Sequence, residues 1–225
     1  FTELQPAIDA AIDGDVLFIG PGTYGPAVVD GKGLALVGFP GGGVTLAGGL
    51  TVRNQTFHNL VVVGVNLRSP NLAPALRVEN SSGHVRLQAC DLQGGQVWKD
   101  GGDAVELRAT SSVVFVDCAI RGADGLDDYG PLQSGGQGGW GVDAQSAGFA
   151  LHRCTVIGGD GGAGDEDGGH AGHGMRLYQS WASATSSRFE GGDGGLALYG
   201  IDGLARPGVA LSTGDATVEL LATQA

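Results

Sequence analysis

The sequence predicts an all-β solenoid in which short strands stack as about seven repeated coils. Four stretches share one pattern, in which an alternating apolar run reaches a small residue, continues for three residues and turns on glycine. These small residues are Cys90, Cys118, Cys154 and Ser187, spaced by 28, 36 and 33 residues. Self-similarity at such spacings is typical of stacked repeats that bury their apolar faces only against their neighbours. The 44 glycines among 225 residues are expected in the turns between strands.

Bulk composition places the chain as one domain, residues 1–225, and excludes several kinds of partner. The net charge is −12 and Lys32 and Lys99 are its two lysines, which argues against nucleic acid and anionic membranes. No apolar run approaches the ~18 residues of a transmembrane span. The sequence starts at Phe1 without an initiator methionine, so we expect a removed leader or a trimmed start. An extracellular or cell-surface location is therefore predicted.

The three cysteines occupy one repeat position, which predicts a ladder of small side chains inside the stack. Equivalent positions of neighbouring coils lie ~4.8 Å apart, the spacing of adjacent strands. Val65 fits the same position one coil earlier, and Ser187 extends the ladder. A position shared by Val, Cys and Ser indicates packing, as is usual for buried free cysteine. Oxidation of one adjacent pair stays open, because this spacing is within disulfide reach.

The N-terminal 14 residues are predicted to form a cap helix. Leu4, Ile8 and Ile12 recur at helical spacing within residues 3–12, with Thr2 as a suitable N-cap. A strand at 16–19 and a turn at 20–24 follow. Further strands are predicted from short alternating runs bounded by Gly, Asn, Ser or Asp. They cover 27–29, 34–37, 50–52, 60–67, 76–78, 85–87, 105–107, 113–116, 142–144, 149–151, 175–177, 209–211 and 218–220.

The C-terminal stretch 216–225 is predicted to be one more strand with no cap after it. An uncovered coil exposes a strand edge that proteins usually protect. We therefore expect either that the native chain continues beyond Ala225 or that another chain stacks there, giving a homo-oligomer.

The opening of the chain resembles a known family. The run from Leu4 to Tyr24, with Gly14-Asp15 and Pro21-Gly-Thr-Tyr, and then 32–38, is similar to the start of right-handed parallel β-helix proteins of the pectin-lyase-like superfamily. Within that superfamily it is most like glycine-rich, secreted bacterial β-helix proteins of unassigned function. The resemblance implies that the helix caps the first coil. It leaves activity open, because members include lyases, hydrolases, adhesins and inert spacers.

Insertions gather at one corner of the repeat, at 94–103, 122–141, 158–174 and 191–208. Because the coils stack in register, these loops should lie side by side on one face, where function usually resides. They carry 10 of the 24 acidic residues, namely Asp100, Asp103, Asp124, Asp127, Asp128, Asp160, Asp165, Glu166, Asp167 and Asp193. Aromatic residues accompany these acids, and the predicted ligand or partner face consists of Trp98, Asp103, Tyr129 and Trp140.

Calcium is one ligand that this acidic face could take, although no cofactor is required. Carboxylate-rich loops bent by glycine suit a hard cation with six to eight oxygen ligands. The candidate ligands are Asp160, Asp165, Glu166, Asp167 and Asp193. Neither the strict calcium nonapeptide nor an EF-hand loop is present. His170 and His173, beside Asp165 and Asp167, are an alternative set for zinc.

No residue is assigned a catalytic role from the sequence. Asp127-Asp128 and Gly172-His173-Gly174 resemble the Asp-Asp and Gly-His-Gly signatures of polygalacturonase-type enzymes, which place an acid and a base about the sugar bond. A whole coil separates the two elements here, and the family's Asn-Thr-Asp and Arg-x-Lys segments are missing. Lyase chemistry would need a cation and a basic residue. Only Lys99 and Arg121 are near this corner.

These observations predict a non-catalytic extracellular structural or adhesive module, with self-assembly through its last coil. One rival is a carbohydrate-active enzyme, either a polygalacturonase-like hydrolase using Asp127, Asp128 and His173 or a polysaccharide lyase. A second rival is a calcium-dependent glycan-binding module. In each case a polysaccharide is the expected partner.

Overall fold

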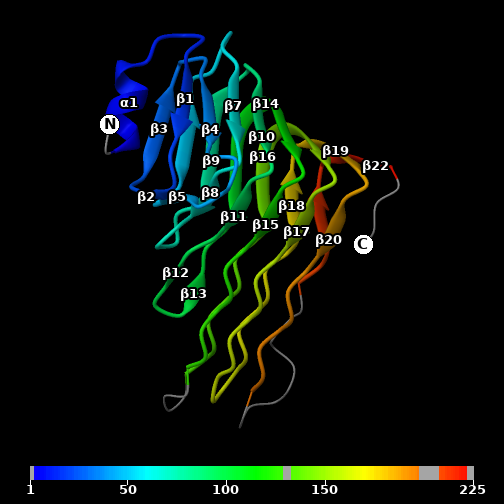
Figure 1. Ribbon diagram of the computed structural model, residues 1–225. Helices are drawn as coiled ribbons and strands as arrows, with labels where there is room; N and C mark the ends of the chain where they lie inside the picture. The colour runs from blue at the N-terminus through cyan, green and yellow to red at the C-terminus, as the bar shows by residue number, and fades with distance from the viewer. Residues whose placement is uncertain (1–2, 129–132, 198–207, 222–225) are drawn as a thin grey trace.

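The computed structural model describes residues 3–128, 133–197 and 208–221, which coil into a parallel β-helix (Figure 1). A short helix, α1 (Leu4–Ala10), precedes the strands. The strands pair in parallel from coil to coil, and the small hairpin of β12 (Gln96–Val97) and β13 (Asp100–Gly101) is antiparallel. The described part of the chain contains no helix long and apolar enough to cross a membrane.

Each coil has three sides, and the strands of each side form a stack. Stack one contains β3 (Ala27–Asp30), β6 (Leu50–Arg53), β9 (Leu76–Ser81), the first halves of β14 (Val105–Val116) and β16 (Val142–His152), β18 (Met175–Tyr178) and β21 (Leu211–Gly214). Stack two contains β1 (Val16–Ile19), β4 (Ala35–Gly38), β7 (Leu60–Val63), β10 (Val85–Gln88), the second halves of β14 and β16, β19 (Trp181–Thr185) and β22 (Thr217–Leu221). Stack three contains β2 (Gly22–Tyr24), β5 (Val44–Ala47), β8 (Asn66–Arg68), β11 (Asp91–Gln93), β15 (Ala119–Arg121), β17 (Thr155–Ile157) and β20 (Arg188–Glu190). The seven strands of stack three confirm the predicted number of coils.

Single residues in the left-handed conformation turn the chain between stacks. Asn80 and Ser146 have φ of 50° and 51° between stacks one and two, and Ala89 and Arg153 have φ of 51° and 53° between stacks two and three. Between stacks two and three the N–H of the corner residue bonds across coils, from Ala89 to the carbonyl of Val116 and from Arg153 to that of Thr185, both at 3.0 Å. Asn tolerates this conformation, whereas a residue with a bulkier side chain is held in it by the surrounding ladder.

The predicted ladder of small side chains is confirmed. Val65, Cys90, Cys118, Cys154 and Ser187 each follow a corner and are all at most 3% exposed. The three thiols are free. Hydrogen bonding with Cys118, together with burial, raises the pKa of the Cys90 and Cys154 thiols, which therefore stay protonated. This ladder position serves packing.

The helix closes the first coil through both apolar and polar contacts. Leu4 and Ile8 are buried against the stack. The Gln5 amide pairs with the backbone N–H and C=O of Val28. The Lys32 ammonium donates to the carbonyls of Ile8, Asp9 and Ala11 at 2.9–3.0 Å. The residue at the N-cap is Glu3, without a side-chain cap, and the suggested cap Thr2 lies outside the described residues.

The strand predictions need several corrections. The strands β5 and β19 were not predicted, and β2 occupies part of the predicted turn at 20–24. The three residues after each ladder position form stack three, whereas the sequence pattern suggested an approach to a turn. Gly64 divides the predicted strand 60–67 in two, because its φ of 64° bends the chain. The paired predictions in 105–116 and in 142–152 are continuous strands. The strand predicted at 209–211 begins at Leu211.

Replacing Lys32 tests how the helix is held. In Lys32→Met the carbonyls at the end of α1 lose three charge-assisted donors while the aliphatic stem remains. We expect the free energy of unfolding in urea to fall by about 1–3 kcal/mol. Arg86→Met is the matched control, since Arg86 is exposed and its guanidinium donates to the side chain of Gln88 on the same strand. Equal losses in the two variants would contradict this account of the cap.

Candidate functional site

The glycine-rich insertions leave the β-helix after stack three and run side by side away from it (Figure 1). Residues 122–128, 158–164 and 191–197 run outward, and 133–141 and 169–174 return. We call these five segments the glycine bundle. Their adjacency was predicted, and backbone hydrogen bonds between them confirm it.

Hydrogen bonds in the bundle recur every three residues. In the outward segment 158–164, the N–H groups of Gly161 and Gly164 donate to the next outward segment, at 2.8 and 2.9 Å. Those of Gly159 and Gly162 donate to the preceding return segment, both at 2.8 Å. A chain with three residues per turn and no internal hydrogen bonds has the character of a polyproline II helix. The bundle is thus a lattice of such helices rather than a set of loops.

Glycine is required here by close packing, which corrects the expectation that glycine serves the turns. A Cβ at Gly136 would lie 1.6 Å from the carbonyl oxygen of Lys99, and one at Gly162 would lie 2.0 Å from that of Leu126. Among the described glycines, those beyond Gly64 have φ outside the left-handed region. Their role resembles that of collagen glycines, which occupy every third position because only they fit.

In five of the three-residue repeats the remaining residue donates its backbone N–H to an aspartate carboxylate. Each carboxylate accepts from a residue one coil further along, at 2.7–2.9 Å. The pairs are Asp100 with Gln137, Asp103 with Trp140, Asp124 with Asp160, Asp127 with Ala163, and Asp160 with Asp193. The acceptors Asp100 and Asp103, like Asp124 and Asp127, are three residues apart, which matches the helical repeat. Much of the acidic stripe therefore has a structural role.

The structure does not gather the candidate calcium ligands into one cluster. Asp160 bonds to the backbone of Asp193, whereas Asp165, Glu166 and Asp167 lie beyond Gly164 in the turn between two segments. No group of three or more His, Cys, Asp or Glu side chains suited to a metal ion occurs within 3–128, 133–197 and 208–221. The alternative zinc set with His170 and His173 therefore does not form such a group among the described residues either.

The catalytic candidates lie at different depths of the bundle. Asp127 is level with Ala163, whose N–H it binds, and Asp128 pairs with the same residue through its backbone. His173 is near the β-helix, where its Nδ1 accepts the N–H of Val209 at 3.1 Å. Burial lowers the pKa of His173, and the positive charge of Arg176 lowers it further. Four to five residues of extended helix, about 12–15 Å, separate the two levels, so no common cleft is formed.

The predicted partner face is also divided. Trp98 has φ of 58° in the β12–β13 hairpin and is 92% exposed. Tyr129 lies outside the described residues. Asp103 and Trp140 are brought together at the base of the bundle, where the return segments enter stack one.

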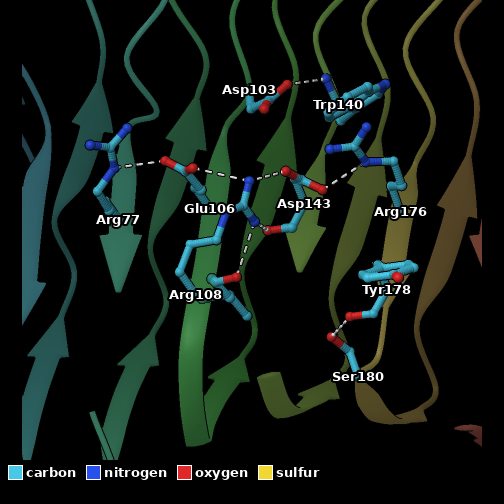
Figure 2. Close-up of polar contacts among 10 residues, drawn as sticks. Arg77, Asp103, Glu106, Arg108, Trp140, Asp143, Arg176, Tyr178 and Ser180 are labelled. Carbon is cyan, nitrogen blue, oxygen red and sulfur yellow. Dashed lines mark hydrogen bonds and ion pairs between the residues drawn. The ribbon is translucent and has the colours of Figure 1, made fainter. Parts of the chain in front are cut away.

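Figure 2 shows a row of charged side chains on the outer face of stack one, below Asp103 and Trp140. Arg77, Glu106, Asp143 and Arg176 are paired in register on neighbouring strands. Glu106 binds Arg77 at 2.6 Å and Arg108 at 3.0 Å. Asp143 is only 3% exposed, and its carboxylate pairs with Arg108 and, at 2.8 Å, with Arg176. Two guanidinium groups thus compensate one buried carboxylate.

Asp103 and Trp140 join this row through Arg176. The Arg176 guanidinium lies 3.3 Å from the centroid of the Trp140 ring, a cation–π contact. Burial raises the pKa of Asp103 to about 6, and the negative charges of Asp143 and Glu106 act in the same direction. The hydrogen bond from the Trp140 backbone N–H opposes this shift. We call Asp103, Trp140, Asp143 and Arg176 the base cluster. It combines an aromatic face, a guanidinium and a carboxyl group that titrates near neutrality.

Asp143 and Arg176 were not predicted from the sequence, although a signal for them exists. Glu106, Asp143 and Arg176 are each the second residue of a predicted strand, between two inward apolar residues. Aligning the strands of successive coils would have placed them in one outward row.

The strand register and three-sided coils decide the architecture. The chain is a parallel β-helix. No protein-family model matches its sequence, and no curated protein matches it either.

Three solved structures show partial likeness. A pectin methylesterase mutant in complex with a hexasaccharide has 15% identity and a TM-score of 0.42, covering 84% of this chain and 66% of its own. The pectate lyase Pel9A has 13% identity and a TM-score of 0.33, covering 82% and 63%. ORF18 of Geobacillus virus E2 has 12% identity and a TM-score of 0.31, covering 96% and 57%. The β-helix therefore spans less than two thirds of the chains that it matches, and these similarities carry no information about its activity.

A methyl group inside the bundle should disrupt it. In Gly162→Ala the new Cβ would meet the Leu126 carbonyl, so we expect a loss of more than 3 kcal/mol of stability or separate melting of the bundle. Hydrogen exchange of residues 122–197 and thermal unfolding would measure this. Gly25→Ala is the matched control, because nothing lies within 4 Å of its Cβ. A variant as stable and as protected as the control would refute the close packing.

Neutralising Asp103 should stabilise the protein at neutral pH. The pKa of Asp103 is about 6 in the folded protein and about 4 in the unfolded chain, so its ionisation destabilises the folded state. This destabilisation is absent below pH 4 and is fully present above pH 6. Asp103→Asn keeps an acceptor for Trp140 and should be about 1–3 kcal/mol more stable than the wild type at pH 7, with no gain at pH 4. Asp100→Asn, which keeps the equivalent contact to Gln137, is the control in urea unfolding at both pH values. A gain for Asp103→Asn that is independent of pH would contradict the burial of this charge.

Proposed function

We propose that this chain is a non-catalytic, extracellular recognition module of the structural or adhesive kind, with a polysaccharide as its partner. The observation that supports this most is the use of the acidic face. Five of its carboxylates accept backbone N–H groups of the next coil, so they contribute to holding the bundle together. The polygalacturonase-like candidates are also held at different levels of the bundle.

The extensive hydrogen bonding of the glycine bundle makes it suitable as a rigid binding surface. Each segment is hydrogen-bonded to neighbouring segments, and 133–141, 158–164 and 191–197 also donate backbone N–H groups to aspartates, so the backbone of the bundle has little freedom left to lose. A preorganised surface binds with a smaller entropic cost than a flexible loop. Long connections at the outer end of a rigid scaffold are also where recognition residues usually lie.

Trp98 is the recognition residue that the structure favours on this face. It is 92% exposed at the hairpin beside the bundle, and its φ of 58° is a strained conformation for a bulky residue. An exposed indole offers a flat apolar face and an N–H donor, a combination that suits the faces and hydroxyls of a sugar ring.

A second function, a carbohydrate-active enzyme, is favoured by the base cluster alone. Asp103, with its pKa near 6, can hold a proton close to neutral pH, and the Asp143 carboxylate is fixed nearby by Arg176. Acid–base catalysis requires such a group with a pKa near the working pH. This candidate uses Asp103 and Asp143, in place of Asp127, Asp128 and His173.

Binding and turnover assays on the same polysaccharides separate the two functions. We expect the wild type to bind at least one polymer in a panel of neutral and uronic polysaccharides, including esterified and unesterified polygalacturonan, without bond cleavage or de-esterification. Trp98→Ala should weaken binding at least tenfold by calorimetry, whereas Trp181→Ala, 46% exposed on β19, should not. Repeating the titration with calcium and with a chelator tests the cation.

Turnover of any polymer, lost in Asp103→Asn and retained in Asp100→Asn, would overturn the non-catalytic function in favour of the enzyme. Absence of binding to every polymer would remove the polysaccharide from the proposal.

A further inference from the structure

The outer face of stack two is apolar over its first three coils. The outward side chains here alternate with the buried core residues Leu36 and Val62. They are Val16 and Phe18 on β1, Ala35 and Val37 on β4, and Val61 and Val63 on β7, paired in register as two rows. We call these six residues the apolar outer face.

Beyond the third coil the same two rows are mixed in character. They continue with Arg86 and Gln88 on β10, Val114 and Val116 on β14, Ala150 and His152 on β16, and Ser183 and Thr185 on β19. Parallel strands that are apolar on both faces are typical of sheets covered on both sides. Phe18 is nevertheless 82% exposed and Val16 is 50% exposed. The sequence of these strands therefore suits a covered surface.

The amount of exposed apolar surface is that of a protein interface. The turns at the ends of these strands add Ile12, Phe39 and Phe57, which are 71%, 54% and 95% exposed. At the 150–250 Å² that an aromatic side chain can bury, Phe18, Phe39 and Phe57 alone offer roughly 350–600 Å². An interface of standard size, to which each partner contributes ~800 Å², would therefore include these turn residues as well as the six residues of the apolar outer face. Exposed apolar patches of this extent mark interaction sites.

The position of the acidic glycine bundle favours a second copy of this chain as the occupant. The glycine bundle leaves the corner between stacks three and one, across the coil from stack two (Figure 1). Two copies that meet through stack two keep their acidic bundles on opposite outer sides, which limits repulsion between two chains of charge −12.

We propose that two copies of this chain pair face to face through the apolar outer face, forming a symmetric dimer. A nearly flat sheet surface without charges is self-complementary, as a two-fold interface requires. The two sheets pack about 10 Å apart, with Phe18 of each copy against the β4 and β7 side chains of the other. The bundles then project outward in both copies, so the dimer presents two recognition surfaces. This interface is distinct from stacking through the last coil.

Sedimentation or light scattering over a concentration series tests the dimer. The wild type should have twice the chain mass of 22.6 kDa at micromolar concentration. Phe18→Glu, placed on an exposed side chain, should give the 22.6 kDa monomer with an unchanged melting temperature after correction for dimer dissociation. Trp98→Glu is the matched control, since it adds the same charge at an equally exposed aromatic residue and should remain dimeric.

Three results would overturn the proposal. The first is a wild-type monomer up to about 100 µM. The second is a dimer that Phe18→Glu and Val37→Glu both leave intact. The third is an oligomer abolished by a charged residue in β22 and unaffected by Phe18→Glu, which would place association at the last coil. Since none of these readouts uses a polysaccharide, failure of the dimer and failure of the recognition function are distinguishable.

Discussion

Hydrogen bonding between successive coils is the constraint on which every other feature depends. In the β-helix it sets the register of the three stacks, and it places Val65, Cys90, Cys118, Cys154 and Ser187 in one buried ladder. The same hydrogen bonding between coils continues beyond stack three, where the strands are followed by segments rich in glycine and aspartate with three residues per turn. Side chains that are 33–37 residues apart thereby become neighbours, as Asp103 and Trp140 do. The site is a product of stacking and not of local sequence.

Two periods share this axial repeat. Strands have a two-residue period, so Glu106, Asp143 and Arg176 fall in one outward row on stack one. Bundle segments have a three-residue period, so glycines at 136 and 139 face the interior and aspartates at 124 and 127 cap the next coil. The base cluster lies where one period changes to the other, with Asp103 at the end of the bundle pattern and Asp143 within the strand pattern. The buried carboxyl of Asp103 and the Arg176 guanidinium stacked on Trp140 are close together because the glycine bundle meets the strands of stack one at this point.

Much of the fold could be predicted from the sequence, because its apolar runs alternate and its ladder position recurs. A strand was expected at 85–87, for example, and β10 (Val85–Gln88) pairs there with β7. The glycine bundle could not be recognised in the same way, since glycine is equally suited to turns and to close packing. The signal was the spacing of three shared by Asp100 and Asp103, Asp124 and Asp127, and Gly159 and Gly162. Its meaning depends on hydrogen-bond partners in other coils, which no single segment reveals.

The arrangement of polar and apolar surfaces gives the molecule two sides with different physical roles. Aspartates and glycines occupy the corner between stacks three and one, where each carboxylate gains a backbone partner only if a further coil is present. The apolar outer face lies across the coil and gains nothing from further coils, because its side chains point away from the stack. Adding coils thus stabilises the bundle, whereas only contact with another surface can stabilise the apolar outer face. Growth along the axis and association across it are therefore separate properties of this chain.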